Sequence, residues 1–424
     1  MSFPYMAQTP IHVLVIPSNR FVCPDAPHGS VFQQHQAHAL ARAGFRVGVV
    51  APAPQSLRTL AMPALWGRSQ VEREDDHGIP VFRYQGVNWT TGRLMRLYQR
   101  QFDRSAVRLV QHYIAEQGCP DIIHAHNCLY AGSFAARRLA RYGSPLVITE
   151  HCSLYTQRAL ARWELAHVRC AARQAAARLA VSSNLCSLLE AIVGDPTLRW
   201  EYVPNVLDRL FEQQAPPERQ RLPGCIFRFL CIANLYKIKN IAGLLQAFAI
   251  GPGRQAGFEL RIGGDGPERE NLRRLVATLR LESSVHLLGR LCREEVFREI
   301  CDCDVFVLPS HYETFGVVLI EAAACGKPLI ATKGSGPDGI VHADNGVLVP
   351  PDDPAALAAA MTELAANVHR YDAHAIRKNC LERFGERALV EKLRSIYLRV
   401  LSVPADPAQS RWSGGDSPLQ SDAK

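Results

Sequence analysis

The 424-residue sequence contains no apolar run approaching the roughly 18–20 residues that a membrane-spanning helix requires. Its first apolar stretch, residues 11–17, has neither the length nor the cleavage site of a signal peptide, so we expect a cytoplasmic protein. The thirteen cysteines form no C-x-x-C pair, and the closest two are Cys301 and Cys303. This spacing favours reduced thiols over disulfides or a zinc site.

Lysine is missing from the first half of the chain. Residues 1–205 hold 21 arginines, no lysine and 13 acidic residues, whereas the remainder holds 27 basic and 27 acidic residues. The net charge of +8 therefore lies on the first half. Five arginines there recur at steps of three and four, which places them on one helical face. They are Arg93, Arg96, Arg100, Arg104 and Arg108. Such a stripe is either a solvated surface or a site for an anionic membrane or a lipid diphosphate.

Apolar strand-like runs alternate with helical patterns along the whole chain, which predicts parallel sheets covered by helices on both faces. In the first half the expected strands are 12–16, 46–50, 80–84, 121–124, 146–149, 179–181 and 200–203, and the expected helices are 31–43, 93–117, 130–142, 158–177 and 184–193. In the second half the expected strands are 227–233, 259–263, 285–288, 304–308, 329–332 and 346–349.

The length exceeds that of one compact core, and a polar stretch containing Pro216 and Pro217 offers a linker. We therefore predict an α/β protein with two doubly wound, Rossmann-like domains facing a cleft, with ligands at the carboxyl ends of the strands. The expected domains are residues 1–205 and 206–385, followed by a helix over 386–403. The tail over 404–424 has the composition of a disordered segment.

The most informative stretch is residues 309–350, where Glu313 and Glu321 are separated by seven residues. An expected buried strand precedes them, and a helix closed by Gly326 follows. Glu313 then lies in the loop at the mouth of this helix, and Glu321 lies on its first turns. The amides of Phe315, Gly316 and Val317 would point out of the helix N-terminus, where they suit a diphosphate. Glu321 can take the two hydroxyls of a ribose, and Glu313 can face a sugar beyond the phosphates.

In sequence order, this stretch and five others resemble the donor-site signature of the retaining glycosyltransferases of family 4, which have the two-domain GT-B fold. The other five motifs are DIIHAH at 121–126, VITEH at 147–151, VS at 181–182, VPN at 203–205 and GGDGPE at 263–268. The likeness covers roughly residues 11–400. It implies that the first domain binds the acceptor, that the second binds a nucleotide-activated sugar, and that the final helix packs back on the first domain.

The resemblance also implies roles for single residues. Lys239 would neutralise the departing diphosphate, while Asn234 stands where the family usually has an arginine. His151 would contact the transferred sugar or the acceptor. Gly29 would let the backbone approach the donor phosphate, although relatives often carry a Gly-Gly pair there.

A strand-to-helix turn on the nucleotide side contains Gly264 and Asp265, and an ordinary loop is the plain alternative for it. No Asp-x-Asp motif stands at a strand end near these residues, and the three histidines His124, His126 and His151 lack a ligand at metal spacing. The resemblance thus implies a retaining hexosyltransferase without a cofactor, and the missing metal motif leads us to expect that it is metal-independent. A UDP-sugar is favoured as donor, and the acceptor would be a sugar, a lipid-linked saccharide or a small molecule.

Two other hypotheses remain open. The first is a GT-B sugar phosphorylase or nucleotide-sugar epimerase, for which the arrangement of Glu313 and Glu321 is not expected. The second is a non-catalytic subunit that binds a nucleotide sugar, suggested by Asn234 and His28 at two usual contact positions. Turnover with a broad acceptor panel separates the second from an enzyme.

Overall fold

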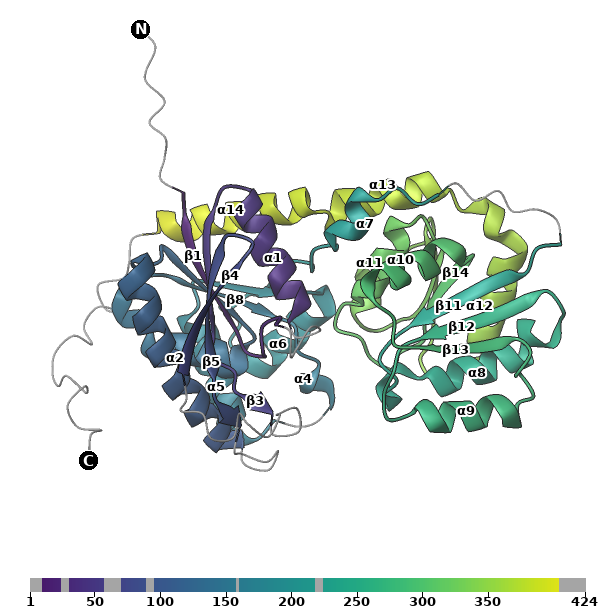
Figure 1. Cartoon of the computed structure of the whole chain (residues 1–424), viewed down its shortest axis with the longest axis horizontal. Helices are drawn as coiled ribbons and strands as arrows, with labels where there is room; N and C mark the ends of the chain where they lie inside the picture. The colour runs from purple at the N-terminus through teal and green to yellow at the C-terminus, as the bar shows by residue number, and fades with distance from the viewer. Residues whose placement is uncertain are drawn as a thin grey trace, which may run out of the picture.

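The computed structural model describes residues 10–23, 30–56, 70–88, 95–157, 160–217 and 224–403. They form two α/β domains, the first at the left and the second at the right of Figure 1. Gly29, Arg93 and the tail over 404–424 lie outside the described residues.

The first domain is built on one eight-stranded sheet. Its strands are β1 (His12–Pro17), β2 (Arg46–Ala51), β4 (Gln70–Asp76), β5 (Ile79–Gln85), β7 (Ile122–His126), β8 (Leu146–Glu150), β9 (Ala177–Ala180) and β10 (Glu201–Tyr202). Their order is β10-β9-β8-β7-β1-β2-β5-β4, and only the β4–β5 pair is antiparallel. The strand order therefore reverses between β1 and β7, and the carboxyl ends of these two strands border a ligand crevice in folds of this kind. Two short strands, β3 (Gln55–Ser56) and β6 (Val87–Asn88), pair separately.

The second sheet has six strands, all parallel. They are β11 (Phe227–Ile232), β12 (Phe258–Gly263), β13 (Val285–Gly289), β14 (Val305–Leu308), β15 (Leu329–Thr332) and β16 (Gly346–Val349). Their order is β13-β12-β11-β14-β15-β16, so this sheet reverses between β11 and β14. The prediction of two doubly wound α/β domains is confirmed.

Helices cover both faces of each sheet. The first sheet packs on one face against α1 (Val31–Arg42) and α14 (Glu386–Ser402), and on the other against α2 (Met95–Gln117), α3 (Ser133–Arg138), α5 (Arg162–Gln174) and α6 (Ser183–Val193). The second sheet packs on one face against α8 (Ile241–Ile250), α9 (Arg269–Thr278) and α12 (Pro354–Asn367), and on the other against α10 (Arg293–Asp302), α11 (Val317–Ala324) and α13 (Ala373–Phe384). The short helices α4 (Leu154–Gln157) and α7 (Arg209–Gln213) lie between these elements along the chain.

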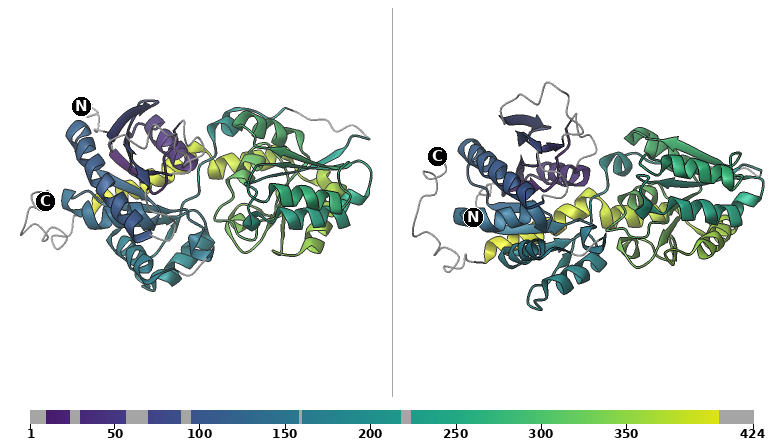
Figure 2. Two further views of the ribbon diagram at one scale, coloured as in Figure 1. Left: turned by 60° about the horizontal axis from the view of Figure 1, so that its bottom comes forward. Right: turned by 90° about the horizontal axis from the view of Figure 1, so that it is seen from below.

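The last helix, α14, returns from the second domain to the first (Figures 1 and 2). Its buried residues recur at helical spacing, which gives it one apolar face. They are Leu389, Val390, Leu393, Ile396, Tyr397 and Val400. This face joins the core formed by β1, β2 and α1, and the hydroxyl of Tyr397 lies 2.7 Å from Nδ1 of His124 on β7. The two chain segments that meet there are 273 residues apart in sequence.

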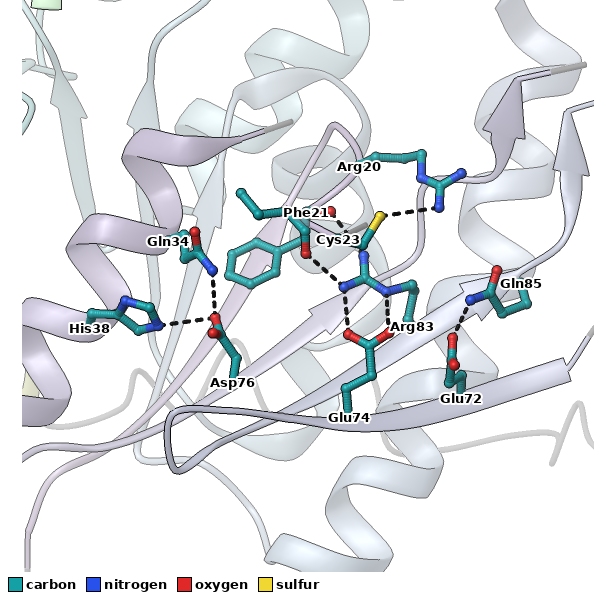
Figure 3. Close-up of polar contacts among 11 residues, drawn as sticks. Arg20, Phe21, Cys23, Gln34, His38, Glu72, Glu74, Asp76, Arg83 and Gln85 are labelled. Carbon is teal, nitrogen blue, oxygen red and sulfur yellow. Dashed lines mark hydrogen bonds and ion pairs between the residues drawn. The ribbon is translucent and has the colours of Figure 1, made fainter. Parts of the chain in front are cut away.

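The segment after β1 is held by a buried arginine (Figure 3). Arg83 on β5, which is 2% exposed, donates to the carbonyls of Phe21 and Val22 at 2.9 Å each, and it pairs with Glu74 on β4 at 2.9 Å. These bonds satisfy a guanidinium that would be costly to bury unpaired. They also fix the direction in which the chain leaves β1.

Two local predictions were wrong, and the edge strand β4 was missed. Residues 130–142 do not form one helix, because Tyr130 has φ 63° and ψ −86° and a π-helical turn at Cys128–Gly132 precedes α3. Contacts from elsewhere hold this break: the Glu150 carboxylate accepts from the amide of Cys128 at 2.8 Å, and Ser18 Oγ accepts from that of Ala131 at 3.1 Å.

The predicted helix 158–177 begins only at Arg162 and ends at Gln174, where the amide of Ala176 turns to the β8 carbonyl of Leu146. Residues 158 and 159 lie outside the described chain. The edge strand β4 was not predicted, because its sequence QVEREDD is strongly charged.

Within the described residues, no helix is both long and apolar enough to cross a bilayer.

Candidate functional site

The second sheet reverses between β11 and β14, and the loops after these two strands carry Lys239 and Glu313. Lys239 ends a short 3₁₀ turn after β11, and Glu313 follows β14 by five residues. The amide of His311 donates to the carbonyl of Ile238 at 2.9 Å, which joins the two loops side by side. The reversal therefore places residues far apart in sequence at one crevice.

Lys239 and Glu313 form an ion pair in this crevice. The ammonium Nζ lies 2.5 Å from the carboxylate Oε2, and the two side chains are 22% and 14% exposed. The hydroxyl of Ser310 donates to the same carboxylate oxygen at 3.3 Å. The partly buried pair places one positive and one negative group within reach of a ligand in the crevice.

The helix that follows Glu313 begins at a glycine in the left-handed region. Gly316, with φ 92°, caps α11, so the helix starts at Val317 and its first amides face the crevice side of the sheet. Phe315 is 2% exposed and its ring packs against Phe384 at 5.8 Å, so only its backbone faces the site. A β-carbon on Gly336 would lie 2.4 Å from Thr314, which shows how closely the next loop covers this turn.

The turn after β12 requires glycine. Gly264 has φ 135°, and a β-carbon there would lie 1.9 Å from the carbonyl oxygen of Ala233 after β11. Asp265 accepts from the amide of Gly266 at 2.9 Å, and its carbonyl accepts from the amide of Leu235 at 3.0 Å. This turn therefore supports the β11 loop, in which the side chain of Asn234 is exposed.

Glu321, on α11, is held by an arginine that the sequence did not single out. Arg293, the first residue of α10, donates from Nη2 to Glu321 Oε1 at 2.6 Å and to Asp208 Oδ2 at 2.7 Å. Glu321 is 3% exposed, and burial raises the pKa of its carboxyl although Arg293 opposes the rise. No local pattern could have identified this partner, because Arg293 lies 28 residues from Glu321 and 85 residues from Asp208 in sequence.

In the first domain, three histidines line the carboxyl ends of β7 and β8. Nδ1 of His126 lies 2.9 Å from Nε2 of His151, and the His124 and His126 rings stack at 4.7 Å. His151 is 9% exposed, and its ring lies 4.7 Å from that of Phe32 on α1. Burial lowers the pKa of both His124 and His151 to about 3 and the pKa of His126 well below its usual value. All three imidazoles are therefore neutral near pH 7.

A buried carboxylate shapes the turn that carries His151. Glu150 is fully buried and accepts from the amides of His151 at 3.0 Å and Cys152 at 2.9 Å, and from the hydroxyl of Tyr155 at 2.6 Å. These bonds satisfy the group, although burial still raises the pKa of its carboxyl. Glu150 was read only as part of a motif, and its structural role was not predicted.

The carboxyl ends of the two sheets face each other. Tyr312, next to Glu313, lies close enough to Thr156 of α4 to interact with it, and burial raises the pKa of the phenol. The side-chain amide of Asn184 on α6 also donates to Asp338 Oδ2 and to the carbonyl of Ser335, at 3.2 Å each. The segment after His151 and the loop that carries Glu313 therefore lie next to each other.

Two family models match almost adjacent parts of the chain. The model described as Glycosyl transferase 4-like domain matches residues 29–206, and the model described as Glycosyl transferases group 1 matches residues 217–381. This chain belongs to the group 1 glycosyltransferases.

Several proteins of known role are similar in sequence to part of this glycosyltransferase. N-acetyl-alpha-D-glucosaminyl L-malate synthase of Bacillus anthracis is 34% identical over 173 residues, which are 40% of this chain and 45% of that protein. An exopolysaccharide phosphotransferase of Streptomyces coelicolor is 31% identical over 52% of this chain and 23% of its own length. The chain thus spans less than half of these two relatives. A glycogen synthase of Mycobacterium tuberculosis is 26% identical over 70% of this chain and 72% of its own length.

Solved structures share its GT-B fold over nearly the whole length. Sucrose-phosphate synthase from Thermosynechococcus elongatus has a TM-score of 0.74 at 20% identity and covers 92% of this chain and 99% of its own. Anabaena HepE in complex with UDP-glucose has a TM-score of 0.68 at 19% identity and covers 92% and 100%. Both comparisons show the fold, and the two-domain GT-B prediction is confirmed.

In this glycosyltransferase, the predicted site residues fall into three places. Lys239 and Glu313 are in contact, Glu321 lies with Arg293 on the side of the connecting segment, and His151 lies in the first domain. Gly29 cannot be placed, because it lies outside the described residues. In the part of the chain that the structure describes, no three His, Cys, Asp or Glu side chains form a group that could hold a metal ion.

Proposed function

We propose that this glycosyltransferase moves a sugar from a nucleotide-diphosphate donor to an acceptor hydroxyl, with retention of anomeric configuration and without a metal ion or cofactor. One observation carries the proposal: the Lys239–Glu313 ion pair lies in the crevice where β11 and β14 diverge, next to the N-terminus of α11. A cation and free helix amides are the groups that stabilise a departing diphosphate.

The proposed reaction assigns one task to each group. The bond between the sugar carbon C1 and the diphosphate oxygen breaks while the acceptor oxygen bonds to C1 from the same face. The acceptor proton passes to the departing phosphate oxygen. Lys239 and the α11 amides hold the diphosphate, and Glu313 contacts the donor sugar. Glu321 accepts from the ribose hydroxyls. His151, which is neutral because burial lowers its pKa to about 3, hydrogen-bonds a sugar or acceptor hydroxyl rather than supplying a charge.

The relatives support a role in polysaccharide, lipid-linked glycan or small-glycoside synthesis. Their names refer to an N-acetylglucosaminyl malate, to glycogen and, in Salmonella typhimurium, to colanic acid. HepE, which shares the fold, has been solved in complex with UDP and with UDP-glucose. We therefore propose a UDP-sugar as the donor and the first domain as the acceptor site.

A thermal-shift screen against UDP, GDP, ADP and their sugars tests the donor class. A nucleotide at a hundredfold excess over its Kd stabilises the folded protein by about 2.7 kcal/mol. Turnover is then measured with the selected donor and an acceptor panel, with and without EDTA, and the anomer of the product is assigned by NMR. An inverted product or loss of turnover in EDTA contradicts the mechanism. Nucleotide binding without turnover on any acceptor instead favours a non-catalytic donor-binding subunit.

We also propose that the first domain docks on an anionic membrane surface or lipid diphosphate. Arg96, Arg100, Arg104 and Arg108 are all exposed on α2, and Leu97 beside them is 44% exposed. Basic side chains at an anionic leaflet contribute about 1 kcal/mol each, so four give reversible attachment.

A further inference from the structure

Arg293 joins two carboxylates that come from different parts of the chain. Its Nε and Nη2 donate to Asp208 Oδ2 at 2.9 and 2.7 Å, and Nη2 also donates to Glu321 Oε1 at 2.6 Å. Its guanidinium further lies 5.1 Å from the centre of the Phe211 ring. A planar guanidinium held by two carboxylates and one aromatic face has little freedom to turn.

The two carboxylates differ in origin and in burial. Asp208 lies in the segment that connects the domains, where it also caps α7 by accepting from the amide of Leu210 at 2.9 Å. Nε2 of His35, on α1 of the first domain, lies 3.9 Å from the same Asp208 oxygen that Arg293 binds. The network thus runs from the first domain through the connecting segment to α11.

Glu321 uses only one of its two oxygens in this network. Oε1 accepts from Arg293 at 2.6 Å, so the bond to Arg293 leaves Oε2 of the same carboxylate available to a ligand. A carboxylate that is 3% exposed is suited to a ligand that donates hydrogen bonds, because burying it without donors is costly. Vicinal hydroxyls are such a ligand, and the arginine sets the direction in which the remaining oxygen points.

We propose that Arg293 is a positioning residue that orients Glu321 toward the ribose hydroxyls of the donor and anchors it to Asp208 in the connecting segment. This inference rests on the proposed function, since it assumes a nucleotide donor. It adds that ribonucleotides are distinguished from 2′-deoxyribonucleotides through the pair of Glu321 and Arg293. A lysine at this position would not replace the arginine, because its single nitrogen cannot occupy the positions of both Nε and Nη2, from which Arg293 binds Asp208 and Glu321.

The test compares the affinities of UDP and 2′-deoxy-UDP by calorimetry. Wild-type protein should bind UDP about tenfold more tightly, as expected for one charge-assisted hydrogen bond. Arg293→Gln and Glu321→Gln should each weaken UDP about tenfold and weaken 2′-deoxy-UDP, which keeps only the 3′-hydroxyl, by a smaller factor. With the donor sugar under turnover conditions, Arg293→Gln should raise KM and leave kcat within about twofold. The matched control is Arg298→Gln, an exposed arginine on the same helix, which should keep wild-type affinities.

A purely structural role for Arg293 predicts a different pattern, in which Arg293→Gln weakens both nucleotides equally. Equal weakening of both nucleotides overturns the inference. An Arg293→Gln variant that keeps the wild-type ratio of the two affinities overturns it as well. If Arg293→Gln does not fold, the same two affinities are measured for Asp208→Asn. Asparagine preserves the α7 cap but removes the charge that anchors Arg293. It should reduce the preference for UDP about threefold, and full wild-type preference would refute the proposal.

Different results contradict the proposed function and the role of Arg293. Wild-type protein that binds none of UDP, GDP or ADP contradicts the proposed nucleotide donor, and the present inference falls with it. Wild-type protein that binds UDP and 2′-deoxy-UDP equally leaves the nucleotide donor standing and overturns the recognition of the 2′-hydroxyl by Glu321 and Arg293.

Discussion

Lys239 and Glu313 neutralise each other at 2.5 Å across two loops that are 74 residues apart in sequence. The resemblance assigned them to different parts of a donor, the cation to the diphosphate and the carboxylate to the sugar. Their contact implies that a donor placed in the crevice shares the ammonium with Glu313, so that each group positions the other.

Replacing Lys239 by alanine should lower kcat by about 10²–10³, because a preorganised cation at the leaving group is lost and Glu313 is left without its partner. Steady-state kinetics with a saturating donor measures the effect. Lys237→Ala is the control, since Lys237 is exposed on the same turn and should keep nearly normal turnover. Near-normal turnover in Lys239→Ala would place the phosphate contact elsewhere, with Lys237 as the next candidate.

Glu321→Ala should weaken nucleotide binding by about 1.5–3 kcal/mol, roughly ten- to a hundredfold, through loss of a charge-assisted contact to the ribose. Calorimetry on folded protein gives the value. Glu294→Ala changes an exposed carboxylate on α10 and should leave the affinity unaltered. If the two variants bind alike, Glu321 does not contact the nucleotide.

Asn234→Arg should tighten binding of a nucleotide diphosphate about twofold to fivefold, which is typical of one exposed charge pair. The side chain of Asn234 is exposed after β11, so an arginine can extend over the crevice without displacing the core. The gain should shrink as salt screens the added charge. Asn234→Gln is the neutral control, and an equal gain from it would exclude an electrostatic cause.

The free energy of unfolding should fall as the pH drops below about 6.5. His124 and His151 have pKa values lowered to about 3 by burial, so the unfolded chain binds protons below pH 6.5 that the folded protein cannot accept. Each such histidine then lowers stability by about 1.4 kcal/mol per pH unit. Urea unfolding between pH 7.5 and 5.5 measures the slope. His124→Gln should flatten it by about that amount, whereas His369→Gln, which changes an exposed side chain, should not.

Replacing the four exposed arginines of α2 with glutamine should abolish binding to anionic vesicles. Wild-type protein should co-sediment with them at low salt and dissociate at high salt, because each arginine contributes about 1 kcal/mol and is screened by ions. Neutral vesicles serve as the control. Equal binding to both lipids, or to neither, would leave the arginine stripe as an ordinary solvated surface.

Much of the candidate site in the second domain was predictable, because its residues follow local patterns. The strand before Glu313, the glycine that starts α11 at Gly316 and the cap at Gly326 are each recognisable from neighbouring residues. Alternating apolar strands and helices likewise specify parallel sheets, and their carboxyl ends are where ligands bind.

The partners of these residues were decided by the tertiary structure. Arg293 binds Asp208, which is 85 residues away in sequence, and Glu321, which is 28 residues away. No local sequence pattern indicates either pair. The break at Tyr130 exists because Glu150 and Ser18 bind backbone amides of residues 128 and 131 more favourably than another helical turn would. Periodicity therefore determines which segments become strands and helices, whereas charge pairing and burial depend on packing between segments that only the folded chain brings together.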